Sequence, residues 1–113
     1  MALILDKTYV DESGNTNLVY IDQYGNSLSD PYLVIDSVQT DKLSKYANVS
    51  VSIYKDKNSR INKSRAILET NYQPDSEENF DAYFSVESML NENIYQKAYE
   101  FISDIYIKWK SDE

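Results

Sequence analysis

Residues 46–56 read Tyr-Ala-Asn-Val-Ser-Val-Ser-Ile-Tyr-Lys-Asp, and apolar and polar side chains alternate along most of this stretch. In an extended chain Val49, Val51 and Ile53 lie on one face, and the serines between them lie on the other. This period is typical of an antiparallel strand that buries one face and exposes the other to water. We therefore predict a strand over residues 48–56.

The segment after this strand predicts a hairpin with a basic tip. It is too polar for a core, and Asp56 is the one acidic residue among its cations. Residues 66–70 then resume a β-like pattern, which predicts a returning strand over residues 65–70. The cations expected at the hairpin tip are Lys55, Lys57, Arg60, Lys63 and Arg65.

Clusters of turn-forming residues separate the remaining β-rich runs of the chain. The runs themselves predict strands over residues 3–10, 17–22 and 32–40. Phe80, Ala82 and Phe84 alternate with polar residues, so we also predict a short last strand over residues 80–85. No internal repeat or second-domain boundary is visible in this pattern.

The hydrophobic period changes near Glu92, where apolar residues begin to recur at steps of three and four. This spacing predicts an amphipathic helix over residues 92–110, with Asn91 as its cap and Lys108 and Lys110 near its C-terminal dipole end. The face expected to pack on the sheet consists of Ile94, Ala98, Phe101, Ile102, Ile105 and Trp109.

Together these elements predict the α+β class. We expect one domain over residues 1–113, with an antiparallel β-sheet or small sandwich or barrel of five to six strands and one C-terminal α-helix packed on it. A second helix stripe of Tyr95, Tyr99 and Tyr106 lies beside the apolar face. Either a cupped sheet buries that stripe internally or a partner covers it.

Composition excludes most enzyme chemistry. The chain has no Cys and no His, which removes thiolate chemistry, imidazole general bases and the usual zinc ligand sets. Its two glycines do not form a phosphate-binding loop. Oxygen donors between Asp11 and Asp22 weakly resemble a calcium loop, but the glycine is misplaced and a strand follows it. We predict no catalytic residues, no cofactor, no metal and no small-molecule substrate.

The chain carries a net charge of -8 and a pI near 4.4. Such a balance disfavours binding to nucleic acid and to anionic membranes. The charges are also uneven, because six carboxylates and no cation fall between residues 75 and 92, after the basic segment. The candidate interface therefore combines the five cations of residues 55–65 with Tyr95, Tyr99 and Tyr106.

Tyrosine is unusually frequent, with 11 residues. This excess indicates either a binding surface or a bias in the coding sequence. No apolar stretch approaches the roughly 20 residues that span a bilayer. The N-terminus also lacks the pattern of a signal peptide. We expect the protein to stay in the compartment that makes it.

Residues 49–110 resemble small virion proteins of tailed bacteriophages, through Tyr83-Phe84 and through Tyr95-Gln-Lys-Ala-Tyr-Glu-Phe-Ile102. The resemblance implies a head-tail, tail or baseplate component that is made in the host bacterial cytoplasm and resides in the virion. Its partners would be other virion proteins and further copies of itself in a homo-oligomer.

Two alternatives remain open at this point. An acidic phage inhibitor of host defence could act as a nucleic-acid mimic, for which a low pI is needed, although the basic segment would interrupt its negative surface. A small enzyme that uses carboxylates alone is the second alternative, and the absence of His and Cys argues against it.

Overall fold

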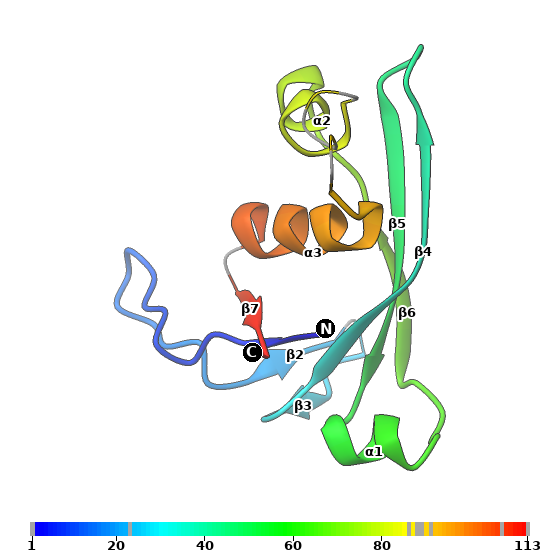
Figure 1. The fold of residues 1–113 in the computed structure, drawn as a ribbon. Coiled ribbons are helices and arrows are strands. Elements are labelled where there is room, and N and C mark those ends of the chain that lie inside the picture. The colour runs from blue at the N-terminus through cyan, green and yellow to red at the C-terminus, as the bar shows by residue number, and fades with distance from the viewer. Residues whose placement is uncertain are drawn as a thin grey trace.

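An antiparallel sheet and two helices on one of its faces make up most of the fold (Figure 1). The computed structural model describes residues 2–22, 24–85, 87, 90, 92–106 and 108–112. Its elements, in chain order, are β1 (Leu3–Leu5), β2 (Tyr20–Ile21), β3 (Ser27–Leu28), β4 (Tyr32–Asp41), β5 (Tyr46–Tyr54), α1 (Lys57–Ile61), β6 (Leu68–Tyr72), α2 (Glu77–Phe84), α3 (Ile94–Ile105) and β7 (Trp109–Ser111).

The main sheet has five strands in the order β6-β5-β4-β1-β7, and each pair of adjacent strands is antiparallel. β4 and β5 form a long hairpin, paired from Tyr32 with Tyr54 to Asp41 with Tyr46. β2 and β3 form a separate two-stranded sheet. The predicted α+β class, with an antiparallel sheet and a C-terminal helix packed on it, is confirmed.

β5 has the two faces that its alternation predicts. Val49, Val51 and Ile53 are at most 1% exposed and belong to the core. On the opposite face, the Ser50 hydroxyl and the Asn48 amide both donate to the Asn71 side chain. In Figure 1, α2 and α3 lie on one side of the β4-β5-β6 sheet, so the polar face is the one that they leave uncovered.

α3 packs on the sheet through the centre of its predicted face. Ala98, Phe101 and Ile102 are fully buried, because they join the side chains of β4 and β5 in one core. The ring of Phe84 from α2 meets Phe101 edge-on, with 5.4 Å between ring centroids. The Asn93 side chain caps α3 by accepting from the Tyr95 N–H at 2.7 Å, in place of the predicted cap Asn91, which lies outside the described residues.

The predicted helix over residues 92–110 is too long. α3 ends at Ile105, and Trp109 lies in β7, which pairs with β1 and completes the sheet. Trp109 is 3% exposed, between two exposed lysines, which is a strand alternation. The helical prediction was wrong here because Trp109 stands four residues after Ile105 and fits both periods.

The predicted strand over residues 80–85 is also wrong, because this segment belongs to α2. The Ser76 hydroxyl accepts from the Asn79 N–H at 3.2 Å, and two acidic residues occupy the first turn. Phe80 and Phe84 are both buried at helical spacing, while Ala82 is exposed. A strand would have placed all three on one face, so the cap and the burial pattern together favour the helix.

The predicted strands near the N-terminus are much shorter than expected. β1 ends at Leu5 because the Asp6 carboxylate accepts from the Thr8 N–H and turns the chain. Only Tyr20–Ile21 of the predicted strand 17–22 is extended and paired. Asn17 is buried instead, and its amide donates to the carbonyls of Asp6 and Lys108, both at 2.9 Å.

Two loops in this region share one sequence pattern and one set of hydrogen bonds. Asp11 and Asp22 each begin an Asp-x-x-Gly-Asn segment. Each carboxylate accepts from the backbone N–H groups two and four residues later. Gly14 and Gly25 have φ of +83° and +80°, a left-handed conformation that favours glycine. The chain therefore contains a short repeated hairpin loop, which corrects the expectation that it has no internal repeat.

The strands of the central hairpins agree better with prediction. β4 covers the predicted strand 32–40, whereas β5 begins and ends two residues before the predicted strand 48–56. β6 is displaced toward the C-terminus from the predicted strand 65–70. β6 begins later than predicted because α1 and its flanking turns occupy the chain between β5 and β6.

Candidate functional site: an assembly interface

The basic connection is the segment of residues 55–67 between β5 and β6, at the lower end of Figure 1. It contains α1, whose cap is Asp56. The Asp56 carboxylate accepts from the Ser59 N–H at 2.7 Å, and this bond lowers the pKa of Asp56 below its usual value. All five predicted cations of this segment are exposed. The predicted hairpin with a basic tip is present, because β5 and β6 pair antiparallel.

The five cations differ in the contacts they already make. Lys57 Nζ lies 3.3 Å from the Asp112 carboxylate, and the Arg60 guanidinium lies over the Tyr54 ring at 5.7 Å from its centroid. None of Lys55, Lys63 and Arg65 forms an ion pair with a residue that the structure describes. These three side chains are therefore the most available for an external carboxylate.

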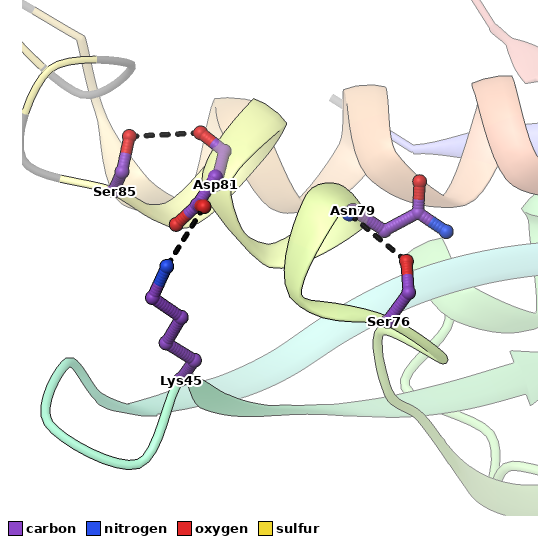
Figure 2. Close-up of polar contacts among 5 residues, drawn as sticks. All are labelled: Lys45, Ser76, Asn79, Asp81 and Ser85. Carbon is purple, nitrogen blue, oxygen red and sulfur yellow. Dashed lines mark hydrogen bonds and ion pairs between the residues drawn. The ribbon is translucent and has the colours of Figure 1, made fainter.

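The acidic end is the surface formed by α2 and by the turn between β4 and β5. Figure 2 shows Lys45 of that turn reaching Asp81 of α2, with 2.9 Å between Nζ and the carboxylate. The Ser85 hydroxyl donates to the Asp81 carbonyl at 2.8 Å. Glu77 and Glu78 are exposed in the first turn of α2, where the helix dipole favours negative charge.

The basic connection and the acidic end lie at opposite ends of the molecule. β5 begins at Tyr46, beside the turn that contacts α2, and ends at Tyr54, just before α1. Nine residues of extended chain span roughly 27 Å. Figure 1 shows α2 at one end of the β4-β5 hairpin and α1 at the other. The basic and acidic segments, which follow one another in the sequence, therefore lie at opposite ends of the folded molecule.

The predicted tyrosine stripe is largely taken up inside the fold. Tyr99 is 8% exposed, and its hydroxyl accepts from the Ile35 N–H at 3.1 Å. The Tyr106 ring is partly buried and packs against Tyr72, with 4.5 Å between centroids. Tyr95 remains 44% exposed. The internal alternative therefore accounts for Tyr99 and Tyr106, and only Tyr95 presents a substantial surface to a partner.

The carboxylates of Asp11 and Asp22 act as turn caps. Backbone hydrogen bonds, led by those from Asn15 and Asn26 respectively, lower the pKa of each carboxyl. Among the residues that the structure describes, no group of three or more Asp or Glu side chains is arranged to hold a metal ion. The geometry of this segment matches a polar hairpin loop.

Two features of this surface were not predicted from the sequence. Leu43 is 99% exposed in the turn between β4 and β5. A cavity of about 270 Å³, open to solvent, lies beside Lys57 and has Ile4, Leu5 and Tyr32 in its lining. An apolar residue within the polar run Asp41-Lys-Leu-Ser-Lys45 was a signal for the first feature. The residues that line the cavity come from segments far apart in the chain, so no local sequence pattern predicts it.

No helix in the described ranges is long and apolar enough to cross a membrane. Comparison with protein-family models, with curated proteins and with solved structures finds no match to this chain.

Proposed function

We propose that this protein is a non-enzymatic assembly subunit whose copies associate head to tail. The basic connection of one copy contacts the acidic end of the next. The observation that carries the proposal is the separation of the two charged segments to opposite ends of the β4-β5 hairpin (Figure 1).

This separation favours a contact between different surfaces of two copies. The rigid strands between the two ends keep one molecule from joining its own charges. A contact of this kind leaves one acidic and one basic end free in every dimer, so further copies can add. Such growth produces a ring if the rotation closes and a tube or filament if it does not.

The contact needs more than charge. An exposed ion pair contributes about 0 to 1 kcal/mol, and salt screens it. The charges would therefore set the orientation and the rate of encounter, and buried apolar area would supply most of the affinity.

We further propose that the assembly belongs to the tail, neck or baseplate of a tailed bacteriophage, with other virion proteins as partners. Its support is the resemblance carried by Tyr83-Phe84 and by residues 95–102. In this fold those residues form the junction of α2 and α3, where Tyr83 contacts Phe101 edge-on at 5.6 Å and donates to Asp104 at 2.8 Å. The exposed surfaces at the two ends remain available for partners.

A charge-reversal experiment tests the head-to-tail contact. The variant Lys55→Glu/Lys63→Glu/Arg65→Glu removes the three cations that form no ion pair with a described residue, and it leaves Lys57 and Arg60 in their present contacts. We expect this variant to lose assembly in light scattering. Adding Glu77→Lys and Glu78→Lys to the same chain reverses both ends and should restore assembly.

Two controls separate assembly from folding. The circular dichroism melt of the three-residue variant should resemble the native melt, since its positions are exposed. The doubly reversed chain should still melt cooperatively but at a lower temperature, because its two new lysines lie in the first turn of α2. Unchanged assembly of the three-residue variant would argue against the proposal. A failure of the doubly reversed chain to recover assembly, with its melt intact, would do the same.

A further inference from the structure

Leu43 is held outward at the acidic end by an ordered turn. The Asp41 carboxylate accepts from the Leu43 N–H at 3.0 Å and from the Ser44 N–H at 3.4 Å. Lys45 adopts a positive φ of 53° and ties the turn to Asp81 of α2. The Leu43 side chain nonetheless makes almost no contact within the chain, because it is 99% exposed. The turn therefore presents a single apolar side chain in a defined position.

The other end of the molecule has a cavity large enough for such a side chain. The lining of the cavity of about 270 Å³ combines apolar side chains with three lysines and one carboxylate: Ile4, Leu5, Tyr32, Ser29, Lys7, Lys57, Lys110 and Asp30. Cavities of about 150 Å³ admit benzene, so this one accommodates a leucine side chain. Lysine stems are apolar, and their ammonium groups remain at the surface.

The charges around the cavity also suit the acidic end. Lys7 pairs with Asp30 at 2.8 Å and Lys57 with Asp112 at 3.3 Å, whereas Lys110 forms no ion pair with a described residue. The neighbouring basic connection adds Lys55, Lys63 and Arg65, which likewise form no ion pair within the described part of the chain. A carboxylate-bearing surface that carries an apolar side chain is therefore the complementary partner.

Leu43 cannot reach the cavity of its own chain. Tyr32, which lines the cavity, begins β4, and Asp41, which holds the Leu43 turn, ends it. The ten residues of β4 separate these two points by roughly 30 Å, since each residue adds about 3.3 Å. A second copy of the chain can bring Leu43 to this cavity.

We propose that Leu43 of one copy inserts into the cavity between β1, β4, α1 and β7 of the next copy. This contact rests on the proposed head-to-tail assembly and supplies the apolar area that the charges alone lack. Glu77 and Glu78, at the same end as Leu43, would then face the cations of the basic connection.

The experiment uses one variant on each side of the contact. Leu43→Ser removes the inserted side chain, and Leu18→Ser is its control, because Leu18 is 53% exposed outside the proposed contact. Ser29→Trp fills the cavity from its exposed rim, and Ser13→Trp in an exposed loop is its control. Thermal melts verify that all four variants fold.

Sedimentation velocity should show that Leu43→Ser and Ser29→Trp each weaken association by roughly 10- to 100-fold, the range expected for the loss of one buried leucine. Both controls should assemble like the native chain. An equimolar mixture of the two variants should form dimers and nothing larger, because it has one intact Leu43 and one intact cavity per pair.

The outcomes separate this inference from the proposed function. If the native protein assembles in a salt-dependent manner and Leu43→Ser assembles equally well, the Leu43 contact is wrong and the charge-driven assembly stands. If the mixture stays monomeric while the native protein assembles, the pairing of Leu43 with this cavity is wrong. A native protein that stays monomeric overturns both proposals.

Discussion

Tyr99→Phe tests whether Tyr99 belongs to the core or to an interface. β4 pairs with β1 only as far as Leu33, and it has a bulge after Ile35. Between these two points the Ile35 N–H donates to the Tyr99 hydroxyl at 3.1 Å. The substitution keeps the ring in the core and removes only the hydroxyl, so the Ile35 N–H loses its partner in a buried position.

The expected cost follows from this geometry. A buried donor without a partner costs about 1 to 3 kcal/mol. For 113 residues the entropy of unfolding is about 0.24 kcal/mol per degree, at ~2.1 cal/mol/K per residue. The melting temperature of Tyr99→Phe should therefore fall by about 4 to 12 °C.

The assay is a thermal melt followed by circular dichroism, with Tyr95→Phe as the matched control. Tyr95 is 44% exposed, so its variant should melt within about 2 °C of the native protein, the range of surface substitutions. Equal melting temperatures for the native protein and Tyr99→Phe would refute the assignment of the Tyr99 hydroxyl to Ile35.

Three further predictions concern stability. Ile102→Ala should cost about 2 to 5 kcal/mol in chemical denaturation, because Ile102 of α3 is fully buried in the core; a loss below 1 kcal/mol would contradict this packing. Backbone hydrogen bonds lower the pKa of Asp22, so its stabilisation is present above pH ~4 and is lost as pH falls through the folded-state pKa. Asp22→Asn should flatten the dependence of melting temperature on pH below pH ~4, and an unchanged slope would count against the cap. Burial raises the pKa of Tyr72 and of Tyr83 to about 12, so stability should decline as pH rises from ~10 toward 12. Absorbance at 295 nm should show a group of tyrosines that titrate late, with Tyr72 and Tyr83 among them, and uniform titration near pH 10 would exclude this burial.

The hydrophobic period predicted correctly those elements whose residues fit only one type of secondary structure. The alternation at Val49, Val51 and Ile53 identified β5 and its buried face, and the spacing of Ala98, Phe101 and Ile102 at steps of three and four identified α3. In both cases one period fits and the other does not. The burial of these residues in one common core then determines the α+β class.

The wrong predictions concern segments in which the same residues fit both the helical and the strand period. Phe80 and Phe84 are four residues apart, a spacing that places them on one face of either a strand or a helix. The Ser76 cap, with acidic residues after it, was the deciding signal. Trp109 also fits the helical pattern of the preceding residues. It forms a strand because it pairs with Leu5 of β1, a contact that the local sequence does not reveal.

The candidate site was predicted in part. The sequence located the cations of residues 55–65 and the carboxylates of residues 75–92, but only the paired strands β4 and β5 place them at opposite ends. Helical periodicity placed Tyr95, Tyr99 and Tyr106 on one stripe, although what covers each ring depends on tertiary packing. The Leu43 turn and the cavity near Lys57 likewise depend on contacts between distant segments.

Sedimentation velocity of the native protein over a range of concentrations, at low salt and at 0.5 M salt, tests the central claim most directly. Head-to-tail assembly through opposite charges predicts species larger than the 13.1 kDa monomer that grow with concentration at low salt and shift toward monomer as salt screens the contact. A single monomeric species at every concentration in low salt, or oligomers indifferent to salt, would contradict the account.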